Sequence, residues 1–191
     1  MLNVSPVSGL PLVEENEATG QVARIYGEVK REMQLPFIPN IHKALAVSPA
    51  ALTVYWEMVR TFYQHVTLPQ SLVAMILFTV ATNKNCRYCS ATHDLTCRTL
   101  GIDETTLTAL VEDLENVSPE RLGAIIEFAV KAAVDAQGLT AEDYEEVRRQ
   151  GVSDAELTEI IFIAGLANLS DTLADALKIE VDSMVLQALG R

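Results

Sequence analysis

The sequence has little positive charge. Of its 191 residues, 14 are Lys or Arg and 26 are Asp or Glu, which gives a formal net charge of -12 at pH 7. Binding to nucleic-acid phosphates needs clustered Lys and Arg, and so does attraction to anionic lipid surfaces. The charge balance therefore argues against nucleic acid and against anionic membrane surfaces as partners.

Long hydrophobic runs are also missing. The longest apolar stretch, residues 72–81, is interrupted by Thr79 and is well short of the roughly 20 residues that span a bilayer. Residues 1–12 lack the basic segment and long apolar run of a secretory signal. From the sequence we expect a cytoplasmic protein with no membrane partner.

Cysteine and histidine are scarce, with three of each. Three cysteines are too few for a framework of structural disulfides, and in a reducing compartment a Cys-x-x-Cys pair is more often catalytic or metal-binding. All three cysteines lie in one stretch, residues 85–97, which reads "NCRYCSATHDLTC" and includes His93. Most of the functional information in the sequence is concentrated here.

Strand patterns are absent as well. No segment alternates apolar and polar residues between turns, and Gly and Pro separate helical patterns instead. The hydrophobic share of 49% predicts a well-buried core. We therefore expect an all-α fold of about eight to ten helices. The chain is interpreted as one domain, 1–191, with an N-terminal arm and helices in 1–50 and the core in 51–191.

Several helix boundaries follow from capping residues. Ser48 precedes Pro49, which suits the first position of a helix over residues 49–65. Residues 72–83 are apolar nearly all round, as expected of a fully buried helix. Thr140 with Asp143 forms a capping-box pattern that predicts a helix to residue 150.

The C-terminal part is expected to hold a helix from Ser153 to Leu166 and a last helix over about residues 170–189. Residues 68–81 can be laid over 152–165 without gaps, with a phenylalanine in register. This overlay suggests a possible duplicated helix-pair unit. Only the first copy has the cysteine pair, so only that copy would carry chemistry.

A zinc site is the first interpretation of the cysteine stretch. Cys86, Cys89, His93 and Cys97 supply four potential ligands, the number in a closed structural site. If the segment is one helix, however, its first and last ligands are separated by roughly 16 Å. A zinc ion with bonds of about 2.0–2.3 Å cannot collect all four, unless a ligand comes from elsewhere. We expect no metal, and interpret Cys97 as a buried, inert thiol.

A redox dithiol is the second interpretation. At the first turn of a helix, free N–H groups and the helix dipole stabilise a thiolate and lower its pKa. Positions i and i+3 are near enough for Cys86 and Cys89 to form a disulfide. His93 lies one turn beyond Cys89 on the same face and could exchange a proton with a thiol. His42 and His65 have no such neighbours and are interpreted as packed or surface residues.

The cysteine stretch resembles a known family. "NCRYCSATH", preceded by the apolar "LPQSLVAMILFTVAT", is similar to the alkylhydroperoxidase AhpD-like family, which groups with the carboxymuconolactone decarboxylase-like proteins, and especially to its peroxidase-related branch. The similarity covers about residues 12–185. It implies an AhpD-like helical bundle, a homo-oligomer, and reduction of a peroxide substrate without a cofactor, with an external dithiol as reductant. By position, Cys89 resembles the attacking thiol, Cys86 the resolving thiol and His93 the proton-relay histidine.

The chain departs from the family pattern at one position. The family relay usually includes a glutamate twelve residues before the first cysteine, and this position is Ala74 here. No acidic residue lies anywhere between Val66 and Cys86. Glu57 and Asp94 are possible substitutes. Glu57 is better interpreted as a surface residue, and Asp94 should point about 100° away from His93 round the helix.

The favoured function is a thiol-dependent peroxidase or dithiol–disulfide oxidoreductase that acts through Cys86 and Cys89. The alternative is a non-catalytic oligomeric helical protein whose cysteine pair is structural or senses redox state. A lactone decarboxylase would need no dithiol, so the cysteine pair argues against that activity. An oligomer is also expected because a helix that is apolar all round needs neighbours on every side.

Overall fold

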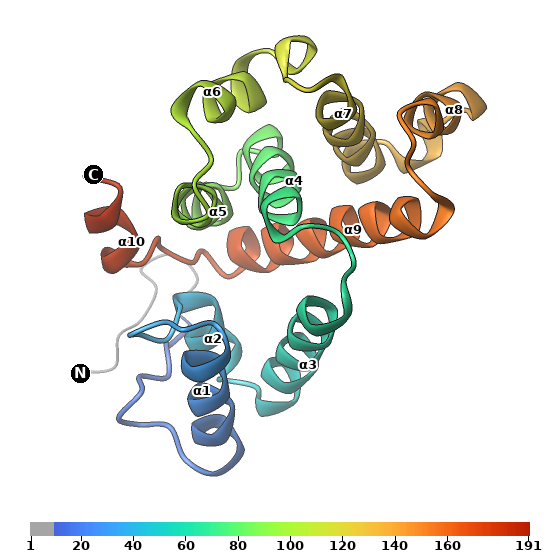
Figure 1. The fold of residues 1–191 in the computed structure, drawn as a ribbon. Helices are drawn as coiled ribbons and strands as arrows, with labels where there is room; N and C mark the ends of the chain where they lie inside the picture. Colours follow the sequence, from blue (N-terminus) through green and yellow to red (C-terminus); the bar gives the residue numbers. More distant parts are fainter. Residues whose placement is uncertain (1–9) are drawn as a thin grey trace. The chain divides into compact units, whose positions relative to one another are not determined.

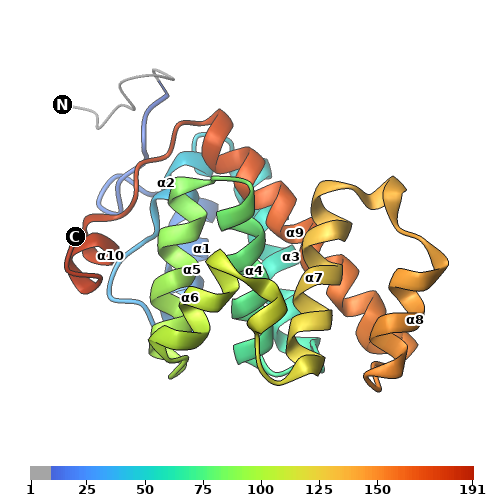
Figure 2. The same ribbon diagram turned by 90° about the horizontal axis from the view of Figure 1, so that it is seen from above.

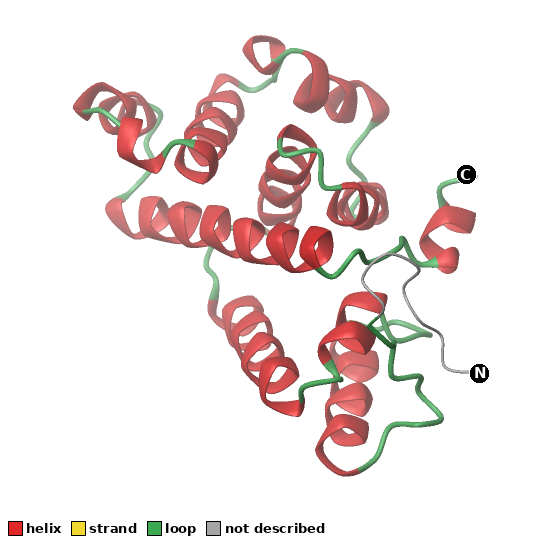
Figure 3. Cartoon of the chain, turned by 180° about the vertical axis from the view of Figure 1, so that it is seen from behind, coloured by secondary structure: helices red, strands yellow, loops and turns green. Residues whose placement is uncertain are grey.

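The fold is seen in a computed structural model that describes residues 10–191 (Figure 1). Within this range the chain forms helices and loops and no strand (Figure 3), which confirms the predicted all-α class. Residues 1–9 of the expected N-terminal arm lie outside the described part. The helices are α1 (Gly20–Glu32), α2 (Asn40–Leu45), α3 (Pro49–His65), α4 (Gln70–Asn83), α5 (Arg87–Thr99), α6 (Glu104–Glu112), α7 (Glu120–Val134), α8 (Ala141–Arg149), α9 (Asp154–Ala176) and α10 (Ser183–Ala188), with short 3-10 helices η1 (Leu114–Asn116) and η2 (Ala136–Gly138).

The helices group into two compact units. The first contains the described residues up to Val66 together with Leu173–Asp182. The second contains Thr67–Thr172 and Ser183–Arg191. The division follows α3 rather than residue 50, where the sequence analysis separated the arm from the core. The two units are described separately below.

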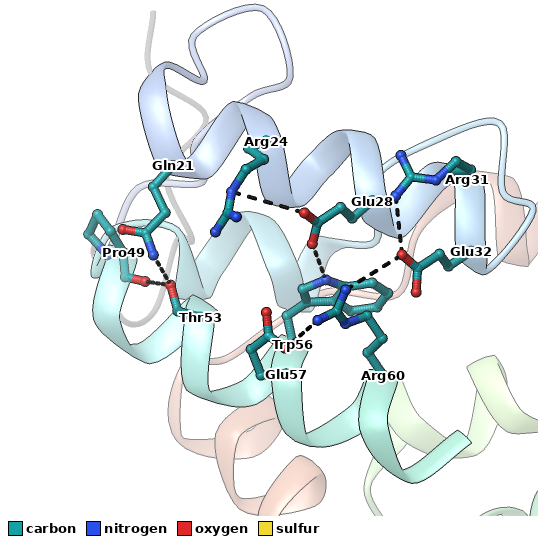
Figure 4. Close-up of polar contacts among 10 residues, drawn as sticks. All are labelled: Gln21, Arg24, Glu28, Arg31, Glu32, Pro49, Thr53, Trp56, Glu57 and Arg60. Carbon is teal, nitrogen blue, oxygen red and sulfur yellow. Dashed lines mark hydrogen bonds and ion pairs between the residues drawn. The ribbon is translucent and has the colours of Figure 1, made fainter. Parts of the chain in front are cut away.

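In the first unit, α1 and α3 pack around Trp56, whose side chain is buried. The indole Nε1 of Trp56 donates a hydrogen bond of 2.9 Å to Glu28 (Figure 4). Arg60 lies one turn further along α3 and pairs with Glu57 at 2.6 Å and with Glu32 at 3.9 Å. A row of paired charged side chains thus runs along one edge of the apolar contact between α1 and α3. The core residues of this pair are Val22, Ile25, Tyr26, Val29, Leu52, Trp56 and Val59.

Two further contacts define the first unit. The side chain of Ser48 accepts a hydrogen bond from the Ala51 N–H at 3.4 Å, and Pro49 is the first residue of α3, as predicted. At the other end of the sequence, Asp182 accepts a hydrogen bond of 2.9 Å from the backbone N–H of Asn40. Asp182 is buried, so this contact joins the segment after α9 to the start of α2.

In the second unit, α4 lies between α5 and α7 (Figures 1 and 2). Every residue from Leu72 to Ala81 is buried, which confirms the prediction of a helix enclosed on all sides. This chain alone supplies that enclosure. The apolar character of α4 therefore gives no support for an oligomer, which stays a prediction. The capping box of Thr140 and Asp143 is also present at the start of α8.

The predicted break after Leu166 is wrong, because α9 continues without interruption to Ala176. No Gly or Pro lies between Leu166 and Ser183, and Asn168 does not end the helix, because its side chain is engaged in tertiary hydrogen bonds. The helix ends near Lys178, which has a left-handed φ of 55°. The last helix is the short α10 rather than residues 170–189, so the second copy of the suggested helix pair does not form two helices.

By length and composition α9 could cross a membrane, a property that the sequence analysis did not assign to it. Half of its most apolar 18-residue window is buried within the protein. A central helix of a water-soluble fold meets the same criterion, so this property carries no argument about a membrane.

Candidate functional site

The cysteine pair lies at the junction of α4 and α5, within the second unit. The junction is a Schellman motif: Cys86 N–H donates to Ala81 C=O at 2.9 Å, and Asn85 N–H donates to Thr82 C=O at 3.0 Å. Asn85 has a left-handed φ of 59°, a conformation that asparagine tolerates better than most residues. This turn places Cys86 at the N-cap of α5 and Cys89 in its first turn, as predicted.

The two thiols are close together and buried. The Sγ atoms of Cys86 and Cys89 and a carboxylate oxygen of Asp171 all lie within 4.8 Å of one another. Cys86 is 0% exposed and Cys89 is 3% exposed. A disulfide bond is about 2.05 Å long, so side-chain rotation and a small approach of the two sulfurs would close it.

Asp171 is the member of this cluster that sequence reasoning missed. It lies on α9, 85 residues after Cys86, and its backbone carbonyl is 4.0 Å from the Cys86 sulfur. The signal was its place in the helical pattern. With α9 continuous, Asp171 shares a face with Ile160, Ala164 and Ala167, all of them buried. An acidic residue on an otherwise apolar helix face indicates a candidate functional site. The predicted helix break at residues 167–169 separated Asp171 from the rest of this face, so the face was not recognised from the sequence.

A positive charge lies beside Asp171. The ammonium group of Lys84, at the end of α4, is 3.7 Å from Asp171 Oδ2. Lys84 also donates a hydrogen bond to the side-chain oxygen of Asn168, whose Nδ2 donates to the Ala133 carbonyl at 2.7 Å. The lysine is therefore anchored to α7 through Asn168 while it faces the carboxylate.

The environment of Cys89 favours the thiol form. Its hydrogen bond with Cys86 contributes most, followed by burial and by the negative charges of Cys86 and Asp171, and together they hold the pKa of Cys89 well above its usual value. The thiolate-stabilising effect expected of the helix N-terminus concerns the first thiol, Cys86, and stays a prediction.

His93 lies one turn beyond Cys89 on α5, as predicted, but outside the close cluster of Cys86, Cys89 and Asp171. It is half-buried, and among residues 10–191 its ring has no hydrogen-bond partner. Burial lowers the pKa of His93 to about 4. The ring is therefore neutral at pH 7 and is a weaker base than an exposed histidine.

The remaining acidic candidates are engaged elsewhere. Glu57 pairs with Arg60 on α3. Asp94 is buried and bound by Arg98 at 2.6 Å and by Arg191 at 3.1 Å. Neither carboxylate belongs to the cluster around the cysteine pair.

Cys97 is fully buried on α5, in agreement with its interpretation as an inert thiol. Burial, followed by the charge of Asp94, raises the pKa of Cys97 to about 12. His65 is exposed at the end of α3, whereas His42 is buried against the rings of Tyr55 and Trp56. Both histidines match the packed or surface role predicted for them.

The cluster also has to be considered as a metal centre. Three donors are one fewer than the four protein ligands of a closed structural zinc site. The ammonium of Lys84, 3.7 Å from Asp171, would repel a further cation at the carboxylate. We therefore interpret the cluster as a dithiol with an acid–base neighbour.

The fold is shared with proteins of the AhpD class. An AhpD-core protein described as peroxidase-related, from Ralstonia eutropha, superposes with a TM-score of 0.81 at 19% identity, over 92% of both chains. A second peroxidase-related protein, from Silicibacter, gives a TM-score of 0.78 at 21% identity, over 86% of both chains. The chain therefore has the AhpD-like fold that the sequence resemblance predicted.

Two other similarities involve dehalogenation. The debrominase Bmp8, in complex with 2,3,4-tribromopyrrole, superposes with a TM-score of 0.80 at 16% identity, over 95% of both chains. An (R)-2-haloacid dehalogenase from Pseudomonas putida is 40% identical over 45 residues, which make up 24% of this chain and 15% of that enzyme. The match thus leaves most of the dehalogenase without a counterpart. No protein-family model matches the chain.

Proposed function

We propose that the protein is a thiol-dependent peroxidase, or more broadly a dithiol–disulfide oxidoreductase, that acts through Cys86 and Cys89. The observation that carries the proposal is the pair of thiols at the first turn of α5, with their sulfurs within 4.8 Å of each other and of a buried carboxylate. The peroxidase-related proteins of the same fold support it.

The reaction uses both thiols. The Cys89 sulfur attacks one peroxide oxygen, an S–O bond forms, the O–O bond breaks, and an alcohol leaves after protonation. Cys86 then attacks the sulfenic acid, which forms the disulfide and releases water. An external dithiol returns the pair to the reduced state. Peroxide gains the two electrons that the thiols lose, so no metal or other cofactor is needed.

The roles of the two thiols follow the family resemblance, and burial agrees with them. Cys89 is the less buried sulfur, whereas Cys86 is fully enclosed and faces the Asp171 carbonyl. His93 is the histidine that the resemblance assigns to proton relay. Because its ring is neutral at pH 7, it is able to accept a proton.

The test is a single peroxide pulse. Reduced protein is mixed with one equivalent of hydrogen peroxide or cumene hydroperoxide, and the Cys86–Cys89 disulfide is quantified by mass spectrometry. Turnover is then followed with excess dithiothreitol. We expect stoichiometric disulfide in the wild type and in Cys97→Ser, a matched control on the same helix, and none in Cys89→Ser. A wild type that forms no disulfide and consumes no peroxide contradicts the proposal.

A second candidate is reductive dehalogenation. It is favoured by the similarity to a debrominase bound to a brominated pyrrole. A dithiol supplies the two electrons that this reaction needs: the carbon–bromine bond breaks, a carbon–hydrogen bond forms, and bromide, a proton and the disulfide are produced. The same cysteine pair could therefore serve either electrophile.

Bromide release separates the two candidates. Reduced protein is incubated with 2,3,4-tribromopyrrole and, separately, with peroxide, each with dithiothreitol. Bromide and disulfide in the first incubation, with no peroxide consumption in the second, would favour dehalogenation. Disulfide from peroxide alone favours the peroxidase.

The non-catalytic alternative makes a different prediction. A structural pair would resist reduction by cellular dithiols and would yield no sulfenic acid that dimedone can trap. A redox sensor would form the disulfide without sustained turnover.

As part of the peroxidase proposal, the protein is a cytoplasmic homo-oligomer without nucleic-acid or membrane partners. Light scattering that shows only monomer at micromolar concentration would contradict the oligomer.

A further inference from the structure

The carboxylate of Asp171 has an unusual position. It is 1% exposed and comes from α9, whereas both thiols belong to the α4–α5 junction. Its oxygen lies within 4.8 Å of each sulfur. The position that holds a glutamate in the similar family is Ala74 on α4 in this chain, so α4 contributes no carboxylate to the dithiol.

The charge of Asp171 cannot by itself activate the thiol. A negative charge next to a thiol disfavours the thiolate, and Asp171 is one of the causes that raise the pKa of Cys89. What a carboxylate at this distance can do is take a proton from the thiol during attack and deliver one to the leaving group. That role differs from stabilising a thiolate at rest.

Lys84 makes the carboxylate suited to this role. Its ammonium, 3.7 Å from Asp171, stabilises negative charge on the carboxylate before the proton moves. The hydrogen bonds from Lys84 to Asn168 and from Asn168 to Ala133 hold the ammonium in place. The charged and titratable groups against Asp171 include Lys84 from the end of α4 and the two thiols from the start of α5.

We propose that Asp171 is the acid–base residue of the dithiol site, and that Lys84 is its positioning residue. This inference rests on the proposed function. As Cys89 attacks, its proton passes to Asp171, the S–O bond forms and the O–O bond breaks. Asp171 then gives that proton to the departing alkoxide, so that alcohol leaves and the carboxylate is restored. The Cys86 proton leaves with the hydroxyl of the sulfenic acid as water.

The test compares two electrophiles on Asp171→Asn. A hydroperoxide releases an alkoxide that needs a proton, whereas iodoacetamide releases iodide, which needs none. In the peroxide pulse we expect disulfide formation to slow by about 10²–10⁴-fold at pH 7. Alkylation of Cys89 by iodoacetamide also requires loss of the thiol proton but no proton on the leaving group, so we expect it to slow by a smaller factor than the peroxide step.

Two matched controls accompany this variant. Asp94→Asn changes the other buried aspartate near a thiol on α5 and should keep the wild-type peroxide rate. His93→Gln should lose less of the peroxide rate than Asp171→Asn.

Lys84→Met should slow the peroxide step by about tenfold, and Lys84→Arg should restore it, since Arg supplies the charge without the original side chain.

Each outcome decides the matter. If Asp171→Asn reacts with peroxide at the wild-type rate while the wild type is active, the inference is overturned and the proposed function stands. If peroxide reaction and alkylation fall by the same factor, Asp171 gives no proton to the leaving group and the inference is again overturned. If the wild type itself does not react with peroxide, both fall.

Discussion

Helix α5 carries two arrangements of a thiol beside an aspartate. At its start, Cys89 lies with Cys86 and Asp171, and the carboxylate has a lysine at 3.7 Å. Near its end, Cys97 lies close to Asp94, whose two oxygens are bound by Arg98 at 2.6 Å and by Arg191 at 3.1 Å. Both thiols are buried and both have a raised pKa.

The difference lies in what each carboxylate can still do. Asp94 is saturated by two guanidinium groups at hydrogen-bonding distance, so its charge is committed to structure. Asp171 has a looser ion pair and two sulfurs next to it. Cys97 also lacks a second thiol, so it could not form a disulfide within the chain. The two ends of α5 therefore differ in the presence of a second thiol and in the partners of the carboxylate.

The largest expected difference between the two ends of α5 comes from removing the attacking thiol. Cys89→Ser should reduce peroxide turnover to the rate without protein, because serine cannot form the sulfenic acid. Cys97→Ser should turn over at the wild-type rate. The measurement is dithiothreitol-dependent peroxide consumption. Equal losses in the two variants would remove the distinction between the two ends of α5.

Removal of the second carboxylate should change stability rather than reactivity. Asp94→Asn loses two charge-assisted hydrogen bonds, and we expect it to lower the free energy of unfolding by about 1–3 kcal/mol. The arginines are 38% and 58% exposed, so they can regain water, and this limits the cost. Urea denaturation measures the change. An Asp94→Asn protein of wild-type stability would show that this pairing contributes nothing.

His93 lies between the two arrangements, and its pKa of about 4 predicts an acid-dependent loss of stability. Below about pH 6.5 the unfolded chain binds a proton that the folded ring does not, so stability falls as the pH decreases from about 6.5 to about 4. The slope is at most about 1.4 kcal/mol per pH unit for one histidine. Buried His42, with a pKa also lowered to about 4, adds to it in the same direction.

This pH dependence is measured by urea denaturation at several pH values between 7 and 4. His93→Gln should flatten the dependence, whereas substitution of the exposed His65 should leave it unchanged. A slope that is identical in wild type and His93→Gln would mean that the ring binds its proton equally in both states.

The smallest expected effect concerns the outer arginine of the second arrangement. Arg191 is 58% exposed, and ion pairs at exposed positions contribute about 0–1 kcal/mol. Arg191→Gln should therefore lower the free energy of unfolding by less than about 1 kcal/mol, and the loss should shrink further in high salt. A loss as large as that of Asp94→Asn would mean that Arg191 alone stabilises the buried carboxylate.

Much of the fold was predictable because local signals agreed. Ser48 with Pro49, the capping box at Thr140 and the all-round apolar residues 72–81 each indicated an element that the structure contains. The boundary predicted within "LANLS" is wrong, because α9 runs through these residues without a break. Asn168 there serves tertiary hydrogen bonds instead of ending the helix, and no local pattern distinguishes these two uses of an asparagine.

Residue patterns alone were enough to predict the helical class, the place of Cys86 and Cys89 at a helix start, and the separation of Cys97 from that pair. These predictions depend on the spacing of residues within one chain segment. In a helix, the fixed rise and rotation per residue turn that spacing directly into a distance. The packing of the helices brings Asp171 and Lys84 to the thiols, and the hydrogen bond with Cys86 together with burial raises the pKa of Cys89. Contacts between residues far apart in the chain, and the water they exclude, depend on how the helices pack.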